Sequence, residues 1–398
     1  MDRDWMNEPK FWMLNQKQWQ KIFLAVLISI LALALRVNLA VNGPVEYDEP
    51  VYVDAALLYA NGVRSGTPGI ILSSDYNIEH PPLNKLAYAA VLGTPPEGGI
   101  SMPFDTAITE LPGFRKLLNM RLVSVFFGCL AVFVLSLINP WAGLFLAIHT
   151  FAVKYTSIIY LEALPLFLSL LSVFMFYRHL SAKTRNTFME KNWWIISAIA
   201  FGTAVASKYL YAVAGAAIVI YYGCLLLSKK EKDWKFLFAW GGIAILVFFI
   251  ADPVLWSNPI QGLSRSIGFH FNYSSDDAVV NIKNYPVYQP LFWLLLSIPQ
   301  HDLHLMPFFV HVNNFWITLD SLILIPALAG VWRLFKKYPL YFIWLVLSLI
   351  ALLTWKVKWP QYIMLIIVPY CLSAGVGIEW IMQQCQKLGN TLWNKIAC

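Results

Sequence analysis

The chain has 398 residues, of which 59% are hydrophobic and 13% charged, and this composition is far more apolar than that of a soluble globular domain. Its formal net charge of +7 is explained by the positive bias of cytoplasmic membrane loops. No basic stripe with interleaved aromatic residues indicates a nucleic-acid partner. The composition therefore excludes a soluble enzyme and predicts an integral, multi-pass membrane protein.

Apolar runs long enough to cross a bilayer recur along almost the whole chain. A spanning helix needs about 20 apolar residues, because lipid offers no partner for unpaired backbone groups. We predict an all-α polytopic bundle of about ten transmembrane helices that forms one domain over residues 1–398. The expected spans are 22–40, 117–138, 141–157, 161–177, 193–208, 210–227, 236–251, 315–332, 339–354 and 361–380.

The distribution of basic residues gives the orientation. Cytoplasmic loops carry an excess of lysine and arginine, and more than half of the 29 basic residues fall in short segments on one side if both termini are cytoplasmic. Two long segments, 41–116 and 252–313, are then extracytoplasmic. We favour the plasma membrane of a prokaryote over the endoplasmic reticulum. The basic residues of the inner segments are Arg3, Lys10, Lys17, Lys21, Arg178, Lys183, Arg185, Lys191, Lys229, Lys230, Lys232, Lys235, Arg333, Lys336, Lys337, Lys387 and Lys395.

The first external segment, 41–116, contains an acidic pair, Asp48 and Glu49, directly after the first span. Pro50 suits the first turn of a helix, which we expect to end at Asn61-Gly62. Two carboxylates at a rigid helix start can supply a general base and its partner. Alternatively, they only charge the helix N-terminus, where the helix dipole favours acids.

Further along this segment, His80 precedes two prolines, and Lys85 follows them. We expect a second short helix to begin after Pro81-Pro82. Neither helix is long enough to span, so both would lie at the membrane surface and fix the acidic pair above the bundle.

Charged groups also occur within the apolar runs. Glu162 lies in IIYLEALPLFL, and an ionisable group in such a place is a functional candidate, although a structural bond to a neighbouring helix is the alternative. Arg36, near the end of the first span, either snorkels to the interface or contacts an anionic lipid group. Four amines lie at external span ends, where they suit a phosphate group: Lys154, Lys208, Lys356 and Lys358.

The second external segment, 252–313, gives weaker signals. Asn272-Tyr273-Ser274 is a glycosylation sequon, and the HDLH spacing puts His301 and His304 on one helix face without further metal ligands in view. The cysteines show no metal-type spacing and indicate neither a disulfide framework nor a zinc site. They lie in expected spans or on the inner side, at Cys129, Cys224, Cys371, Cys385 and Cys398.

Three of these features occur in a fixed order: Asp48-Glu49-Pro50-Val51-Tyr52, then His80-Pro81-Pro82-Leu83-Asn84-Lys85, then Glu162. In this order the chain resembles the GT-C superfamily, specifically the protein O-mannosyltransferase-like, phospholipid carrier-dependent glycosyltransferases. SKYLYA around Lys208, DPVLW from Asp252 and KWPQYIMLIIVP around Tyr362 are similar to family patterns too. The resemblance covers most of the chain and implies a GT-C-like bundle with external juxtamembrane helices.

The resemblance implies a polyprenyl-phosphate sugar donor, an acceptor that is a protein, glycan or lipid, and direct displacement with inversion on the extracytoplasmic side. Asp48 would act as the base, Glu49 would orient the acceptor or Asp48, and Glu162 would bind sugar hydroxyls or orient basic groups. Fixed amines can stabilise the leaving phosphate, so a divalent metal is not required, although one held by Asp48 and another acid remains an alternative. The implied phosphate-binding residues are Lys85, Lys208, Lys356 and Lys358, and the substrate-positioning residues are His80, Tyr52, Arg121 and Tyr362.

A transporter or flippase of lipid-linked saccharides is the rival hypothesis. It would place polar residues near the bilayer midplane along a path to both sides, whereas the polar residues here gather on the outer side. A membrane scaffold is a third reading, and it would tolerate replacement of the acidic pair. Neither rival accounts for the joined motifs.

Overall fold

The chain folds into a bundle of helices. The computed structural model describes residues 16–73, 77–94, 99–181, 188–281, 285–297, 309–312 and 315–396. The α-helices are α1 (Gln16–Asn42), α2 (Glu49–Arg64), α3 (Leu83–Val91), α4 (Phe114–Ile138), α5 (Pro140–Ile148), α6 (Thr150–Tyr155), α7 (Ala163–Ser181), α8 (Phe188–Ser207), α9 (Ala212–Leu227), α10 (Trp234–Ala251), α11 (Pro259–Ser275), α12 (Asp277–Asn281), α13 (Gln289–Leu295), α14 (Leu319–Lys337), α15 (Pro339–Thr354) and α16 (Ile367–Ile396). Two short strands, β1 (Phe309–Val312) and β2 (Phe315–Thr318), pair antiparallel.

The membrane character expected from composition is confirmed. Within the described residues five helices are long and apolar enough to cross a bilayer: Gln18–Asn42, Phe114–Ile138, Ala163–Ser181, Tyr209–Leu227 and Trp234–Ala251. Asn192–Ser207 and Pro339–Thr354 are shorter apolar helices. The total of about ten spans stays a prediction.

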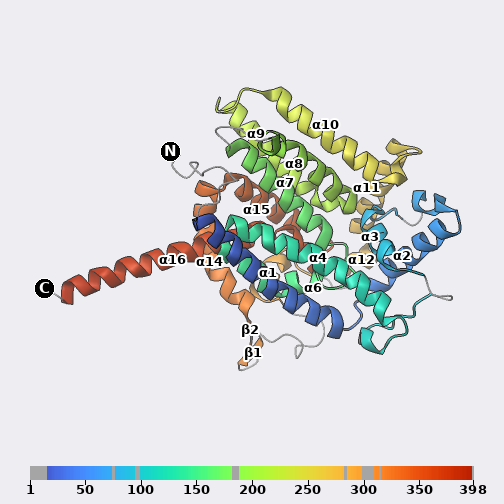
Figure 1. Ribbon diagram of the computed structural model, residues 1–398, viewed down its shortest axis with the longest axis horizontal. Helices are drawn as coiled ribbons and strands as arrows, with labels where there is room; N and C mark the ends of the chain where they lie inside the picture. Colours follow the sequence, from blue (N-terminus) through green and yellow to red (C-terminus); the bar gives the residue numbers. More distant parts are fainter. Residues whose placement is uncertain are drawn as a thin grey trace.

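The segments expected to be external lie together. Figure 1 shows α2, α3 and α11 at one end of the bundle, whereas α1 begins and α16 ends toward the opposite end. Residues nearly 200 positions apart thus meet, since the Ser266 hydroxyl of α11 donates to the Ile78 carbonyl oxygen at 2.6 Å. This end of the bundle carries the acidic pair.

The two short helices of 41–116 differ in how well they were predicted. The second begins after the proline pair, as expected, and is α3. The first, α2, was predicted to end at Asn61-Gly62, but it continues to Arg64. The prediction was wrong because Gly62 stays in helical conformation, where it lets Ile70 of the next turn pack against the helix: a Cβ at Gly62 would lie 2.7 Å from the Ile70 side chain.

The run 141–157 was predicted as one span, and it is broken at His149 into α5 and α6. Two buried charges satisfy the backbone groups that the break frees. The Arg36 guanidinium donates to the carbonyl oxygens of Leu146 and Ala147 at 3.2 and 3.1 Å. The Asp320 carboxylate accepts the N–H of Thr150 at 3.1 Å. Arg36 therefore neither snorkels nor faces lipid, because it closes the end of α5.

The C-terminal helices α14 and α16 cross closely at small residues. A Cβ placed on Gly330 would lie 1.8 Å from the Ser373 carbonyl oxygen, and one on Gly377 would lie 1.8 Å from the Pro326 carbonyl oxygen. The Ser373 hydroxyl also donates to the Ala327 carbonyl oxygen at 2.7 Å. Close contact of backbones through glycine is a common way to pack helices where lipid provides no hydrophobic driving force.

Candidate active site

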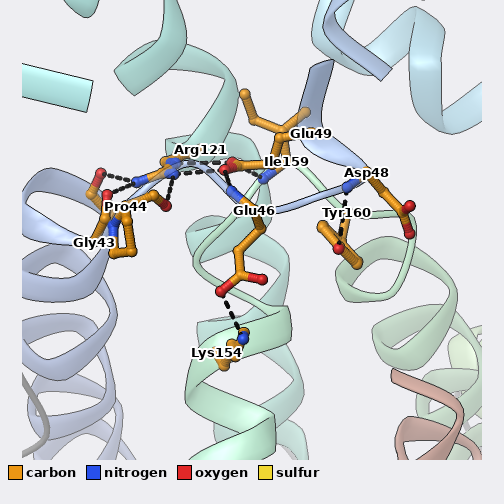
Figure 2. Close-up of polar contacts among 10 residues, drawn as sticks. Gly43, Pro44, Glu46, Asp48, Glu49, Arg121, Lys154, Ile159 and Tyr160 are labelled. Atoms are coloured by element: carbon orange, nitrogen blue, oxygen red, sulfur yellow. Dashed lines mark hydrogen bonds and ion pairs between the residues drawn. The ribbon is translucent and has the colours of Figure 1, made fainter. Parts of the chain in front are cut away.

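The segment from residue 46 to 49 directs three carboxylates to three different surroundings. Figure 2 shows Glu49 turned toward Arg121, Glu46 turned toward Lys154, and Asp48 turned away from both cations. The segment joins the end of α1 to the start of α2, and Glu49 is the first residue of α2. Three neighbouring acids therefore have separate roles.

Glu49 is fully buried and fully bonded. Its oxygens lie 2.9 and 2.6 Å from Nε and Nη2 of Arg121, and they also accept the N–H groups of Ile159 at 2.8 Å and Glu46 at 3.0 Å. Arg121 donates further to the carbonyl oxygens of Ala40, Gly43 and Pro44. This pair ties the end of α1, the start of α2, α4 and the segment after α6 together.

Glu46 forms a second ion pair, with a distance of 2.6 Å between its Oε1 and Lys154 Nζ. Asp48 lies between the two pairs in sequence, but it makes no ion pair among the described residues. Its Oδ2 accepts only a long hydrogen bond of 3.4 Å from Gln361 Nε2, and its backbone N–H donates to the Tyr160 hydroxyl at 3.3 Å. Asp48 is thus the acid of this segment that remains available to a substrate.

The surroundings of Asp48 change its acidity. Burial raises the pKa of Asp48 to about 6, the nearby Lys208 opposes this shift, and Glu79, Glu162 and Glu46 add to it. A carboxylate whose charge is disfavoured in this way is a stronger base than one in water.

Glu162, singled out because it lies in an apolar run, is buried and forms an ion pair with Lys208. The Tyr211 hydroxyl donates to its Oε2 at 2.8 Å. The Lys208 ammonium lies 5.7 Å from the centre of the Tyr362 ring, an arrangement in which the ring attracts the cation. Lys208, Tyr362 and Glu162 are therefore brought together beside Asp48, from three separate parts of the chain.

Lys85 and His80 form the next group. Lys85 Nζ donates to Asn77 Oδ1 at 2.8 Å and to the His80 carbonyl oxygen at 2.9 Å. Burial lowers the pKa of Lys85 to about 8, against the effect of Glu79 and Asp252. Burial, together with Lys208 and Lys85, also holds the pKa of His80 well below its ordinary value. The His80 ring is therefore neutral at pH 7.

Tyr52 lies where it can shape both groups. Its buried ring meets Tyr160 edge-on at 6.0 Å between ring centroids and lies 6.5 Å from the His80 ring. Tyr52 therefore lies near both Asp48 and His80.

The two remaining lysines differ from each other. Lys358 donates to the carbonyl oxygens of Leu352 and Leu353 at 2.7 and 3.1 Å, and also to that of Trp355, so its ammonium closes the C-terminus of α15. Lys356 is exposed. The segment after α15 thus offers one amine held by backbone carbonyl groups and one that is exposed.

Several charged residues at this end and in the bundle were missed from sequence. Glu46 lies two positions before Asp48 in a loop, where carboxylates are ordinary. Asp320 and His149 lie within expected spans, and the rule that identified Glu162 would have identified them too. Asp252 was quoted within DPVLW without a role, and it is buried with its Oδ2 accepting the Tyr209 hydroxyl at 3.0 Å. His301 and His304 lie outside the described residues.

Within the part of the chain that the structure describes, no group of three or more His, Cys, Asp or Glu side chains is arranged to hold a metal ion. The chemistry available from these residues is that of a base, a set of fixed amines and buried hydrogen-bonding groups.

Comparisons with known proteins reveal likeness in structure rather than in sequence. No protein-family model and no curated protein sequence matches the chain. The structure of ArnT from Cupriavidus metallidurans bound to undecaprenyl phosphate matches with a TM-score of 0.59 at 14% identity, over 89% of this chain and 60% of that one. Its apo state gives 0.55 at 14% identity, over 89% and 59%. The S. cerevisiae protein O-mannosyltransferase Pmt1-Pmt2 complex bound to the sugar donor gives 0.43 at 20% identity, over 75% and 38%.

The chain spans about three fifths of the length of ArnT. The likeness to ArnT covers most of this chain. The fold of this protein is therefore similar to that of ArnT, a helical membrane bundle as expected from the sequence.

Proposed function

We propose that the protein is an integral-membrane glycosyltransferase that moves a sugar from a polyprenyl-phosphate carrier to an acceptor on the extracytoplasmic side, with inversion at the anomeric carbon. The observation that carries this proposal is the position of Asp48. Of the three acids in its segment, Glu46 and Glu49 are paired with cations, and Asp48 is held beside Lys208 with its carboxylate left to a substrate.

Asp48 accepts the proton of the acceptor hydroxyl or amine. The acceptor atom then attacks the anomeric carbon, and the bond between that carbon and the phosphate oxygen breaks, so that the electron pair leaves with the phosphate. Glu49, through Arg121 and the Ile159 backbone, fixes the helix start that aims Asp48, and is a positioning residue in this proposal.

The leaving phosphate gains negative charge, and fixed cations that are already in place stabilise it. Lys208 beside Asp48, exposed Lys356 and Lys85 supply this charge. Glu162 orients Lys208 through their ion pair. Lys358 acts indirectly, because its three bonds to carbonyl oxygens hold the segment that carries Lys356 and Gln361.

The ArnT structure is described as bound to undecaprenyl phosphate, and the Pmt1-Pmt2 structure as bound to the sugar donor. The shared fold with ArnT supports a lipid-phosphate carrier for this chain too. A polyprenyl tail suits the lipid-facing grooves of a helix bundle, while its phosphate reaches the polar end where the lysines gather.

The test is transfer from a radiolabelled polyprenyl-phosphate hexose, in vesicles reconstituted with the purified protein and an extract of membrane lipids and proteins. We expect label to move to an acceptor with the parent, and the rate to fall by about 100-fold or more with Asp48→Asn, which cannot accept the proton. Asp54→Asn is the matched control, because Asp54 is an exposed acid of α2, the helix that begins directly after Asp48.

Both variants must unfold at the same temperature as the parent for the comparison to count. Equal transfer by the parent and Asp48→Asn would contradict the assignment of the base. A different result would identify the protein as a transporter: no sugar is transferred from any hexose donor, but the lipid-linked sugar crosses the bilayer, and this crossing depends on Asp48.

A further inference from the structure

Asp252 is a buried acid that the proposed reaction does not use. It follows α10, in the turn that leads into the short helix Pro253–Leu255. One oxygen, Oδ2, accepts the Tyr209 hydroxyl at 3.0 Å. The other, Oδ1, is buried and has no hydrogen-bond partner among the described residues. A buried carboxylate oxygen without a hydrogen-bond partner destabilises the fold, so a ligand or another function is expected at such a position.

Asp252 occupies the N-cap position of the short helix, and the Tyr209 hydroxyl and the Val254 backbone N–H both favour its charged form. Its Oδ1 nevertheless has no hydrogen bond of standard geometry among the described residues. Its surroundings are polar, because Lys85 and Asp252 each stabilise the charged form of the other. Asp252 therefore faces the Lys85 side of the site.

Two more buried polar atoms without a partner among the described residues lie on the segment that carries Lys85. They are Nδ1 of His80 and Nδ2 of Asn84. The His80 ring lies 5.9 Å from the His270 ring, which lies 6.4 Å from the Tyr209 ring. His80 and Asp252 are thus connected through a continuous set of side chains.

α11 covers this group from outside. His270 Nε2 lies 2.8 Å from the Glu79 carbonyl oxygen, and Ser266 bonds to Ile78. The residues just before the proline pair are therefore packed against α11, and Tyr209, which bonds to Asp252, adjoins the same face of α11.

The combination of groups selects one kind of ligand. A carboxylate repels a phosphate, and an ammonium repels a cationic amine. The carboxylate, the ammonium, the amide donor and the neutral imidazole together suit a ligand with neutral hydroxyl groups, because a hydroxyl group both donates and accepts hydrogen bonds.

We propose that Asp252, positioned by Tyr209, and Asn84 form the subsite that binds the hydroxyl groups of the donor sugar ring. A sugar hydroxyl donates to Asp252 Oδ1, and the amide of Asn84 donates to a sugar oxygen, next to the Lys85 that holds the phosphate. This inference rests on the proposed function, because it assigns the sugar of that donor.

The test compares binding of two lipids to the purified protein in detergent: undecaprenyl phosphate, and undecaprenyl phosphate linked to glucose or mannose. For Asp252→Asn we expect affinity for the sugar-linked lipid that the parent binds to fall by about tenfold, the usual effect of one hydrogen bond to a charged group. Affinity for the bare lipid phosphate should change less than twofold. Asn84→Ala should show the same pattern with a smaller loss, and it removes an amide whose Nδ2 has no described partner. Asp54→Asn is again the control.

Equal loss for both lipids, or loss for neither, would overturn the inference, since a structural role or a phosphate role gives no dependence on the sugar. Asn84→Ala gives the answer if Asp252→Asn does not fold. Failure of the proposed function has a different signature: a folded parent that binds neither lipid.

Discussion

At the scale of single residues, the acidic pair shows how position decides chemistry. Glu49 enters α2 and points back into the bundle, where four hydrogen bonds, two of them from the Arg121 guanidinium, hold it in place. Asp48, one residue earlier, lies outside the helix and meets no cation within ion-pair distance among the described residues. Two successive residues at the start of a helix point in different directions. When one of the two carboxylates points into the bundle, the other is therefore left for a substrate.

The rate of the proposed transfer should follow a bell-shaped pH profile. Below about pH 6 Asp48 is protonated and cannot accept a proton, so kcat/KM should rise with pH through that value. Above about pH 8 Lys85 loses its charge and the leaving phosphate loses a partner, so the rate should fall. Measurement of kcat/KM from pH 5 to pH 9 tests both limbs.

Two variants test which residue is responsible for each limb of the pH profile. Lys85→Arg should extend activity to higher pH, because a guanidinium stays charged. Asp252→Asn should keep the acidic limb, although burial also raises the pKa of Asp252 to about 6. An acidic limb near pH 4, the ordinary range of a carboxylate, would contradict the role given to Asp48.

The Glu49–Arg121 pair should be needed for stability rather than for chemistry. Arg121→Met leaves a buried carboxylate without its cation, and such losses cost about 3–5 kcal/mol. The double variant Glu49→Gln/Arg121→Met should lose less than the sum of the two single variants, since no buried charge is then left alone. Thermal unfolding in detergent measures all three, and strictly additive losses would contradict direct coupling.

The sequence could identify such residues only where charge conflicts with its surroundings. Glu162 was found because it interrupts an apolar run, and it forms an ion pair with Lys208. Its expected role in the reaction stays a prediction. The cation that pairs with Glu49 could not be predicted from the sequence in this way. Arg121 is 72 positions away, and nothing in its local sequence indicates which acid it meets.

At the scale of elements, the presence of the helices could be predicted from the sequence, but the break within one of them could not. The run from 141 to 157 is mostly apolar, and although His149 interrupts it, the hydrophobic period does not show that the helix breaks there. The break is stable because Arg36 from α1 and Asp320 from α14 satisfy the freed backbone groups, and both are contributed by tertiary structure.

The α14–α16 crossing should tolerate no side chain at its glycines. Gly377→Ala would place a methyl group 1.8 Å from a backbone carbonyl oxygen, so the helices must separate, at a cost of about 1–3 kcal/mol. Gly241→Ala, in α10, is the matched control, because nothing lies within 4 Å of its Cβ position and alanine is the better helix former. Thermal unfolding should separate the two variants, and equal melting temperatures would show that the crossing is not close in the protein.

At the scale of the whole molecule, composition and motif order were sufficient to predict a helical membrane bundle, and its fold is similar to that of ArnT. They could not give the way α11 folds back over the 77–85 segment, since that contact joins residues nearly 200 positions apart. The helices at this end have separate origins in the chain, and the candidate site exists only where they meet.

The proposed orientation places this end outside the cell, and labelling of thiols can test it. The native cysteines are expected in spans or on the inner side, and Cys385 of α16 is exposed. Exposed Asp54 of α2 lies at the opposite end. A membrane-impermeant maleimide applied to right-side-out vesicles should therefore label the Asp54→Cys variant and leave the parent unlabelled. Opening the vesicles with detergent should then label Cys385 in both. Labelling of the parent in sealed vesicles, with Asp54→Cys adding nothing until they are opened, would reverse the orientation and put Asp48 and its lipid-linked donor on the cytoplasmic side.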